Sequence, residues 1–482
     1  MQNLNLKHIY LVGGLFAILQ ALAIAFEFYY FSLIPLVLLV ILLAFAKLNY
    51  LVLAIVFMAP VSVNLEGLGI DGFGLYLPTE PLLIGVMLFF ILKLLNNDSM
   101  DKRILVHPVS WCIYTYLIWT LITCFTSSHI LISFKYLISR AWFIVTFFFI
   151  SVKLFKDKKN LDRYFWFYIF PLFFVMLYTM TRHAMNGFEH DPAHWVMTPF
   201  FNDHTSYGAA LAFTLPMFLG MFFTDKLKST TKVLLIPALA IFCAALVLSY
   251  TRAAWVSLAA AAAVGVIMYF RVKLSLLFSV TAIGAFLLFF TVDQLLMDLE
   301  RNDQDSSESF SEHVESSFNI STDASNLERL NRWGSAIRMF EERPIVGWGP
   351  GTYAFEYAPF QRASDRTIIT TDSGDMGTAH SEYLGPLSEK GLFGPFVYLA
   401  IIISVTISAF RVVYSLPNGH LKMLAVTAYL GLFTYYVHGI LNNFLDTDKI
   451  SCLFWGFSAM IVALDLFHVK KEDALTSLDS RH

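Results

Sequence analysis

Long apolar runs separated by short polar segments follow one another along most of the chain. A bilayer core is about 30 Å thick and an α-helix rises about 1.5 Å per residue, so about 20 apolar residues are needed to cross it. Fourteen runs come close to that length: 9–26, 28–46, 48–63, 79–95, 108–126, 138–154, 161–180, 204–223, 233–250, 253–270, 274–292, 385–408, 422–441 and 449–466. Because the junctions at Glu27 and at Tyr250–Arg252 are tight, we expect 12 to 14 separate spans. The pattern predicts an all-α fold, a polytopic transmembrane helical bundle.

One polar segment of roughly ninety residues separates the eleventh run from the twelfth. The predicted organisation is therefore a bundle of eleven spans over residues 1–292, a long loop over 293–384, further spans over 385–466 and a tail over 467–482. A membrane protein that keeps so long a polar loop is expected to use it at the bilayer surface.

Composition agrees with a membrane protein and narrows its partners. Of the 482 residues, 57% are hydrophobic and 14% are charged, whereas about a quarter of the residues of a typical soluble domain are charged. The net charge of −3 gives no basis for a nucleic-acid partner. The four cysteines lie in apolar runs, without the paired spacing of a disulfide framework or a metal site, and we interpret them as small buried hydrophobic residues.

Lysine and arginine are unevenly distributed between alternate polar segments. Cytoplasmic loops of membrane proteins are enriched in both residues. With a cytoplasmic N-terminus, the inner segments carry 20 of the 33 cations and the short outer loops carry five. We therefore predict cytoplasmic N- and C-termini, with the loop over 293–384 outside the cytoplasm.

The kind of cation also differs between the two sides. The 20 inner cations comprise 15 Lys and 5 Arg, and the 13 outer ones comprise 3 Lys and 10 Arg. The orientation of the spans depends on positive charge and not on the choice between Lys and Arg. The planar guanidinium of Arg, however, binds phosphate oxygens in pairs and keeps its proton at a low-dielectric interface. The Arg-rich outer segments therefore indicate either an anionic ligand presented from the membrane or local pairing with Asp, Glu and lipid headgroups.

Within the long loop, the segment SNLERLNRWGSAIRMFEERP predicts an amphipathic helix that ends before Pro344. Its apolar residues recur every three or four positions: Leu330, Trp333, Ile337 and Phe340. Arg329 and Trp333 lie one turn apart with Arg332 beside them, which would suit a lipid-linked phosphate at the membrane interface. The alternative is a helix that only rests on the membrane. The glycines of the following IVGWGPGTY predict a tight turn that folds the loop back over the bundle.

The loop ends with TAHSEYLGPLSEKGLFG, which carries the strongest candidate for chemistry. His380 is close to the start of the next helix, and Glu382 is nearby. Because an imidazole can take a proton from a sugar hydroxyl near neutral pH, His380 is the candidate catalytic base, and a structural histidine is the alternative. A metal site would need Asp372, Asp375, His380 and Glu382, whose spacing matches no established motif. We therefore expect no metal and no cofactor.

Two shorter outer segments add candidate residues. SYTRAAW places Arg252 where one span ends and the next begins, at the outer boundary of the membrane, where a cation indicates function. FFNDHTSYGAALAF places Asp203 and His204 at the start of the eighth span, where they could bind an acceptor. Trp333 and Glu382 are further candidates for positioning the acceptor. The alternative for Asp203 is a helix cap.

These motifs, in this order, resemble the O-antigen ligase and polymerase superfamily of bacterial envelope glycosyltransferases. The resemblance rests on SYTRAAW, on the helix with Arg329 and Trp333 leading into PIVGWGPGTY, and on HSEYLGPLSEKGLFG before a new span. It implies a GT-C-like fold in the bacterial inner membrane and a glycan donor linked to undecaprenyl diphosphate. It also implies His380 as the base, Arg252 and Arg329 as diphosphate contacts, and no metal.

The function predicted on this basis is inverting transfer of a glycan to an acceptor hydroxyl at the periplasmic face, as in an O-antigen ligase. Arg332 is a further candidate for diphosphate binding. The expected partners are the lipid-linked donor, a lipid or glycan acceptor, the membrane, and polysaccharide-export machinery. A polymerase of lipopolysaccharide or exopolysaccharide repeat units differs only in its acceptor and stays an alternative. Alternatives of another class are a lipid-linked oligosaccharide flippase, which inverted repeats and mid-membrane charges would favour, and a non-enzymatic export scaffold.

Overall fold

The computed structural model of the chain describes residues 6–28, 31–32, 34–65, 74–96, 100–224, 226–273, 275–276, 279, 324–362 and 377–469. Two compact units share the chain, Met1–Ala54 and Ile55–His482. The first unit contains α1 (Leu6–Ala25) and most of α2 (Ile34–Met58). Helix α2 has a kink at Lys47, where the backbone leaves the helical region, and this kink coincides with the expected boundary between two apolar runs.

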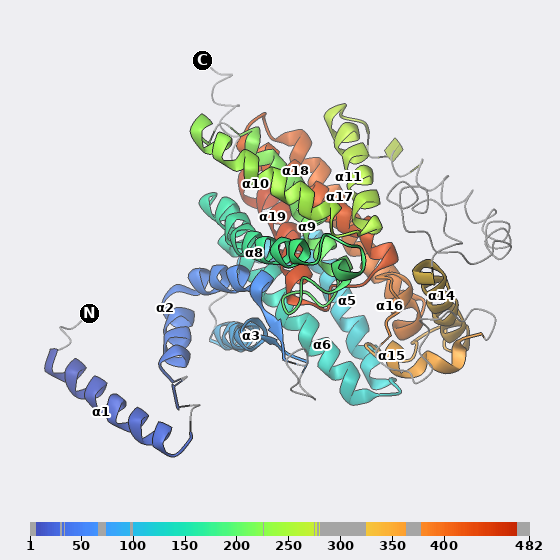
Figure 1. Ribbon diagram of the computed structural model, residues 1–482. Helices are drawn as coiled ribbons and strands as arrows, with labels where there is room; N and C mark the ends of the chain where they lie inside the picture. The colour runs from blue at the N-terminus through green and yellow to red at the C-terminus, as the bar shows by residue number, and fades with distance from the viewer. Residues whose placement is uncertain are drawn as a thin grey trace. The chain divides into compact units, whose positions relative to one another are not determined.

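The second unit is built almost entirely of helices (Figure 1). Its α-helices are α3 (Thr79–Leu95), α4 (Lys102–Leu105), α5 (Pro108–Phe125), α6 (Ile130–Ile144), α7 (Ser151–Leu154), α8 (Lys159–Met185), α9 (His204–Phe222), α10 (Ser229–Val247), α11 (Arg252–Tyr269), α14 (Ala324–Glu342), α15 (Tyr353–Glu356), α16 (Leu384–Lys390), α17 (Phe393–Ser415), α18 (His420–Leu441) and α19 (Asp448–Leu464). A π-helix, η4 (Val145–Ile150), joins α6 to α7, and a second one, η8 (Asp465–Val469), follows α19. Single turns of 3₁₀-helix are η2 (Ala59–Val61), η5 (Asp191–His194) and η6 (Ala358–Phe360).

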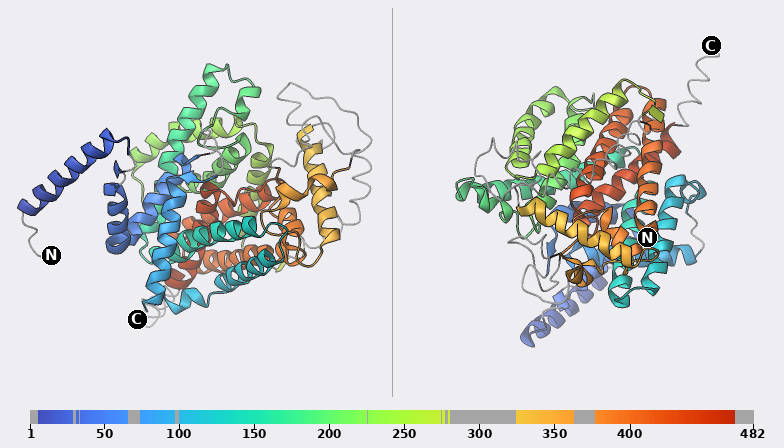
Figure 2. Two further views of the ribbon diagram at one scale, coloured as in Figure 1. Left: turned by 90° about the horizontal axis from the view of Figure 1, so that it is seen from below. Right: turned by 90° about the vertical axis from the view of Figure 1, so that its right-hand side faces the viewer.

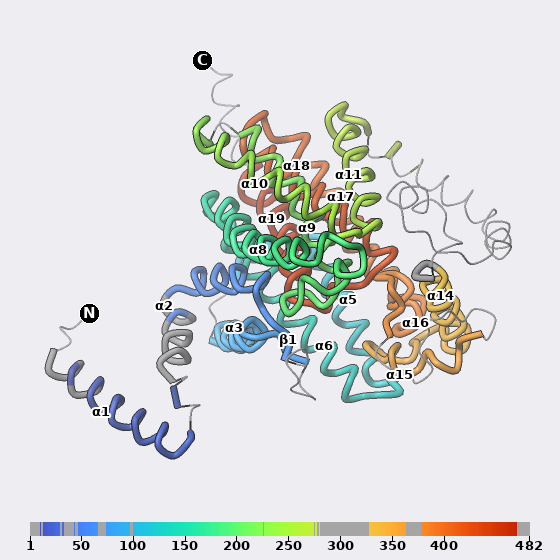
Figure 3. Tube along the Cα trace, viewed as in Figure 1, coloured from blue at the N-terminus to red at the C-terminus, as the bar shows by residue number. Residues whose placement is uncertain are grey.

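The described strands form one short hairpin that precedes α3. Strands β1 (Val63–Asn64) and β2 (Tyr76–Leu77) pair antiparallel, with Asn64 opposite Tyr76 (Figure 3). With this one exception, the described residues confirm the predicted all-α fold.

Nine helices of the described part are long and apolar enough to cross a membrane: Pro108–Phe125, Ile130–Leu154, Lys159–Met185, His204–Phe222, Ser229–Val247, Arg252–Tyr269, Phe393–Ser415, His420–Leu441 and Asp448–Val469. Shorter apolar helices cover Gly13–Ala25 and Lys47–Val61. The expected span over 274–292 falls almost wholly outside the described residues. A polytopic helical membrane protein is therefore confirmed.

Helix α19 is the centre of the bundle. It packs against α17, α18, α9 and the π-helix η4, and 89% of its span is buried by protein, compared with 17% for α10. Both helices are apolar all round, so their sequences do not tell protein contact from lipid contact. Close approach at α19 depends on Gly456, because a Cβ atom there would lie 2.1 Å from the Tyr164 hydroxyl.

Segments expected in the cytoplasm meet at one end of the bundle. At the start of α8, Asp162 pairs with His420 at the start of α18, with 2.6 Å between Oδ1 and Nε2. Asp465 beyond α19 pairs with His107 before α5 and with Arg411 near the end of α17. Candidate residues lie at the opposite end of the bundle, where the charges of Arg329 and Asp203 act on His438 near the end of α18.

The described part of the long loop folds back over the bundle, as the glycine-rich turn predicted. Backbone hydrogen bonds join Trp348 N to Ser388 O (3.1 Å) and Ser128 N, in the α5–α6 turn, to Trp348 O (2.9 Å). The loop also has its own core, formed by Ala336, Met339, Trp348, Tyr353, Tyr357 and Ala379. In the right-hand view of Figure 2, α14 crosses the end of the bundle that carries this loop.

The expected span over 385–408 differs in the structure, where the segment forms two helices. Helix α16 ends at Lys390, Gly391 takes a φ of 65°, and α17 begins at Phe393. A side chain at Gly391 would meet the carbonyl of Ile345, since its Cβ would lie 2.2 Å from that oxygen. The break therefore follows from the loop packing against the α16–α17 junction, which local hydrophobicity does not reveal.

Candidate active site

His380 lies on a short segment just before α16. Its φ of 48° is in the left-handed region, which an ordinary side chain adopts rarely and only where its surroundings hold it. The neighbouring Ala379 is buried in the loop core, and the Ser381 hydroxyl accepts hydrogen bonds from Tyr383 N and Leu384 N at 3.3 Å. His380 itself is half-buried. Packing on one side and a capping serine on the other thus fix the backbone that presents the imidazole.

Charged residues from two distant segments surround His380. Burial, followed by the guanidinium groups of Arg332 and Arg329, lowers the pKa of His380 to about 4, against the opposing effect of Asp203 and Glu328. The imidazole is therefore neutral at pH 7 and able to accept a proton. The structure thus brings together three of the residues selected from the sequence, Arg329, Arg332 and Asp203, around a fourth, His380.

Arg332 holds the His380 segment to α14. Its Nε donates to Glu328 Oε1 at 2.8 Å, one turn earlier, and its Nη1 donates to Thr378 O at 3.3 Å. The guanidinium also lies 5.1 Å from the ring centre of Tyr357. Gly377 is required here, because a Cβ would lie 1.7 Å from Arg332 Nη1. These partners indicate that Arg332 positions the loop while its charge acts on His380.

Arg329 lies where three helices and the loop meet. Its charge acts on His380, on His204 at the start of α9 and on His438 near the end of α18. These positions are far apart in the sequence. Helix α14 therefore carries a guanidinium over the end of the bundle, close to three imidazoles.

Asp203 is the N-cap of α9, as one of the two predictions for this residue had it. Its carboxylate accepts hydrogen bonds from Ser206 N at 2.7 Å and from Thr205 Oγ1 at 2.6 Å. The same charge acts on His380. His204 Nδ1 lies 3.1 Å from His194 Nδ1, so one of these imidazoles donates to the other. Asp203 thus combines a structural contact with a place in the site.

Arg252 begins α11 beside the start of α9. The preceding Thr251 donates from Oγ1 to His204 O at 2.8 Å. Gly208 allows this approach, because a Cβ there would lie 2.5 Å from Thr251 Oγ1. The following Ala253 contacts His438 through its backbone. Arg252 is half-buried. The contacts of its two chain neighbours therefore hold it close to His204 and His438.

Glu382 points away from His380, into the turn between α18 and α19. Its Oε1 accepts from Tyr435 OH at 2.6 Å and from Phe444 N and Leu445 N, both at 2.9 Å. These buried contacts make Glu382 a residue that positions the His380 segment and does not have to touch an acceptor.

A cleft of about 350 Å³ opens beside the His380 segment. It is lined by Trp333, Ser381, Tyr383, Leu384 and Ile440. Apart from the serine, the lining is apolar or aromatic, and Ile440 is 46% exposed. Trp333 thus faces an apolar cleft that begins one residue away from the candidate base.

Sequence reasoning missed His438. It is buried on α18, its Nε2 lies 3.2 Å from Asn442 Nδ2, and the charges of Arg329 and Asp203 act on it. The available signal was an ionisable residue inside an apolar run, which by itself indicates function. The apolar pattern over 422–441 predicts only a membrane span.

Some of the outer cations that suggested a phosphate ligand have protein partners instead. Arg140 on α6 donates to Leu445 O and lies 4.8 Å from the Tyr136 ring centre. Arg182 donates to Val196 O at 3.1 Å and lies 5.3 Å from the Trp195 ring centre. Local pairing therefore explains part of the Arg enrichment.

The possible metal ligands are only partly described. Among the residues for which positions are given, no group of three or more His, Cys, Asp or Glu side chains could hold a metal ion. Asp372 and Asp375, from the set considered above, lie outside the described residues, as does the acidic stretch over 293–323.

The long apolar helices and the polar site at one end of them define a multi-pass membrane protein. Residues 237–399, about a third of the chain, are similar to the family described as O-antigen ligase, whose model they match. The matched segment contains Arg252, Arg329, Arg332 and His380 and leaves Asp203 outside. No curated protein matches the chain.

Proposed function

We propose that this chain transfers a glycan from an undecaprenyl-diphosphate-linked donor to an acceptor hydroxyl at the extracytoplasmic face, with inversion and without a metal. The observation that carries the proposal is a neutral imidazole, His380, under the influence of two guanidinium groups, Arg329 and Arg332. A site of this kind combines a general base with cations for a departing diphosphate.

In the proposed reaction, His380 takes the proton of the acceptor hydroxyl while the oxygen attacks the anomeric carbon. The bond between that carbon and the diphosphate oxygen breaks, and the diphosphate leaves with the electron pair. Arg252 and Arg329 offset its charge. Attack from the face opposite the leaving group inverts the anomeric centre. The proton on His380 then passes to solvent, which restores the base.

The cleft at Trp333 supports a lipid-linked donor. An apolar cleft one residue from His380 would allow the first isoprenes to pack beside Trp333 and Ile440 while the diphosphate reaches the arginines. Arg332, already bonded to Glu328 and Thr378 O, would hold the loop and supply charge at longer range.

The purified chain in detergent tests the proposal directly. With a diphosphate-linked glycan lipid and an acceptor, we expect glycosylated acceptor and free undecaprenyl diphosphate in equal amounts, also in the presence of EDTA. A flippase would move the donor lipid across vesicles without releasing undecaprenyl diphosphate, and an export scaffold would do neither. Release that stops with EDTA and returns with a divalent cation would refute the metal-independent mechanism.

The acceptor distinguishes a ligase from a polymerase. We propose the ligase reaction, in which loss of the gene leaves long glycan chains that are not attached to their final anchor. Loss of a polymerase would leave single repeats instead. Glycan ladders from a deletion strain separate the two outcomes.

The pH dependence of kcat/KM should change when the charge of Arg332 is removed. In Arg332→Gln, loss of a neighbouring positive charge raises the pKa of His380 from about 4, and we expect the acid limb of kcat/KM to move up by about 1 to 3 pH units. Because His380 acts deprotonated, activity is lost as pH falls through its pKa, so the variant loses activity at a higher pH than the wild type. Rates measured from pH 4 to 8 test this expectation.

Arg338→Gln is the matched control for the acid limb. Arg338 is on the same helix, but its Nε donates to Phe360 O, and it is not among the strongest influences on the pKa of His380. Its acid limb should match that of the wild type. An Arg332→Gln profile that also coincides with the wild type would remove Arg332 from the electrostatics of the site.

Trp333→Ala should weaken use of the lipid donor. Loss of the aromatic surface of the cleft is expected to raise KM for the full-length donor about tenfold, equivalent to about 1.4 kcal/mol, with little change in kcat. Ile337→Ala is the control, because Ile337 is exposed on the same helix and does not line the cleft. A donor with a truncated lipid should show no difference between Trp333→Ala and wild type. An equal difference for both donors would contradict a lipid contact.

A further inference from the structure

The turn between α18 and α19 contacts both sides of the candidate site. We call residues 442–447 the hub turn. It begins after Leu441 and ends before Asp448, and Thr447 closes it by donating from N (3.0 Å) and Oγ1 (2.8 Å) to Phe444 O. The hub turn lies outside the segment that matches the family.

On one side, the hub turn holds the His380 segment through Glu382. The Glu382 carboxylate accepts from Phe444 N, Leu445 N and Tyr435 OH, and the Tyr435 oxygen in turn accepts from Phe444 N at 2.9 Å. The backbone of Glu382 also donates to Gly439 O at 2.8 Å. Four hydrogen bonds thus join Glu382, two residues after His380, to the end of α18 and the hub turn.

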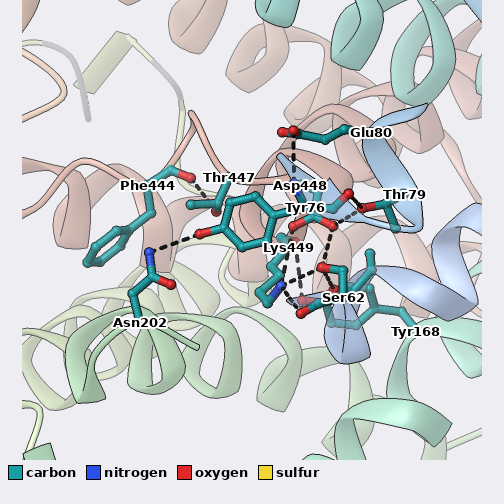
Figure 4. A network of polar contacts seen from close by, with 11 residues as sticks. Ser62, Tyr76, Thr79, Glu80, Tyr168, Asn202, Phe444, Thr447, Asp448 and Lys449 are labelled. Carbon is teal, nitrogen blue, oxygen red and sulfur yellow. Dashed lines mark hydrogen bonds and ion pairs between the residues drawn. The ribbon is translucent and has the colours of Figure 1, made fainter. Parts of the chain in front are cut away.

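On the other side, the hub turn leads directly into a buried polar network (Figure 4). Asp448 Oδ2 accepts from the hydroxyl groups of Ser62 and Thr79. Lys449 Nζ donates to Ser62 Oγ at 2.6 Å and lies 4.5 Å from the ring centre of Tyr76. The first turn of α19 is therefore attached to the hairpin and the start of α3.

Tyr76 extends this network to the start of α9. Its phenol oxygen accepts from Asn202 Nδ2 at 2.9 Å, as Figure 4 shows. Asn202 directly precedes Asp203, the N-cap of α9, and His204. A continuous series of contacts therefore runs from the hub turn through Lys449 and Tyr76 to the Asp203 side of the site.

Burial restricts the residues that make these contacts to few arrangements. Asp448, Lys449, Ser62 and Thr79 are at most 2% exposed, and Glu382 is 6% exposed. A buried, hydrogen-bonded polar group has few alternative arrangements, because any other leaves a donor or acceptor without a partner. The hub turn is therefore a rigid connection and not a flexible link.

We propose that the hub turn sets the separation between His380 and the Asp203–His204 pair, with Tyr435 and Tyr76 as positioning residues. This inference rests on the proposed transfer reaction. General-base catalysis depends on alignment, and a displacement of about 1 Å can lower a rate by about 10²-fold. Tyr435 acts on the base through Glu382, and Tyr76 acts on Asp203 through Asn202. Neither tyrosine has to touch substrate.

Two phenylalanine substitutions test the proposal. Tyr435→Phe removes the hydroxyl that joins Glu382 to Phe444, and Tyr76→Phe removes the acceptor of Asn202 while the ring over Lys449 stays. Each is expected to lower kcat about tenfold, with KM for the donor within about twofold and the acid limb of the pH profile unchanged. A structural role alone would lower the amount of folded protein without changing kcat per folded molecule.

Tyr429→Phe is the matched control for Tyr435→Phe. Tyr429 is also buried on α18, and its hydroxyl donates to Thr406 Oγ1 at 3.1 Å, away from the hub turn. Its kcat should equal that of the wild type. For Tyr76→Phe, the second arm is Asn202→Ala, which removes the same hydrogen bond from the other partner. The double variant should be no slower than either single variant.

The inference is overturned if Tyr435→Phe and Tyr76→Phe both turn over at the wild-type rate, or if Tyr429→Phe loses as much. It is also overturned if kcat of the double variant falls by the product of the two decreases seen in Tyr76→Phe and Asn202→Ala. Should a tyrosine variant fail to fold, Asn202→Ala serves as the test, because Asn202 is exposed and its replacement should not disturb folding. A reduced kcat of Asn202→Ala supports the connection, and an unchanged kcat refutes it. A wild-type protein without transfer activity would instead refute the proposed function.

Discussion

His380→Ala should lower the rate of glycan transfer by about 10²- to 10⁴-fold, the usual contribution of a general base. The imidazole is neutral at pH 7, because burial and the neighbouring guanidinium groups keep its pKa near 4. It is therefore in the form that accepts a proton from the acceptor hydroxyl. KM for the donor should change little, since the arginines and the apolar cleft remain. The measurement is release of undecaprenyl diphosphate by purified protein at matched concentration.

The control for His380→Ala is His129→Ala. His129 is more than a third exposed, pairs with Glu356 at 3.2 Å and lies in the α5–α6 turn, away from the candidate site. Its removal should leave the rate within about twofold of the wild type, as for most surface substitutions. Near wild-type turnover by His380→Ala would eliminate the proposed base.

Arg252→Ala is expected to lower kcat by more than the about 10²- to 10³-fold that loss of one preorganised donor to developing charge costs. Because one guanidinium can supply two hydrogen bonds to a diphosphate, we expect this loss to be at least as large as that of His380→Ala. The contacts of Thr251 and Ala253 hold the backbone at this position, so the variant should keep its fold. Single-turnover rates at saturating donor separate loss of chemistry from loss of binding.

Arg252→Lys keeps the charge but loses the planar fork, so its rate should fall between those of the alanine variant and the wild type. Arg103→Ala is the distant control, because Arg103 pairs with Asp101 at the opposite end of the bundle. Its kcat should not change. If Arg252→Ala keeps the wild-type kcat, the diphosphate is stabilised elsewhere in the site.

Several helices and their ends could be predicted from the sequence. The run over 204–223 became α9, His204–Phe222, and the run over 449–466 became α19, Asp448–Leu464. The Asp203 cap and the stop before Pro344 were also foreseen, since capping and proline effects act within a few residues. Membrane helices can be predicted well from the sequence, because each helix satisfies its backbone hydrogen bonds internally and does not depend on its neighbours for them.

The partners of the polar side chains could not be read in this way. The sequence selected Glu382 and Arg332 but did not show that Glu382 bonds to the hub turn or that Arg332 bonds to Thr378 O. It did not show that His438 lies close to Arg329 and Asp203, or that Gly391 divides α16 from α17. These contacts join residues that lie about fifty to more than two hundred positions apart. They depend on which apolar face of a helix meets protein and which meets lipid. Both faces have the same hydrophobicity, so only the packing of the helices distinguishes them.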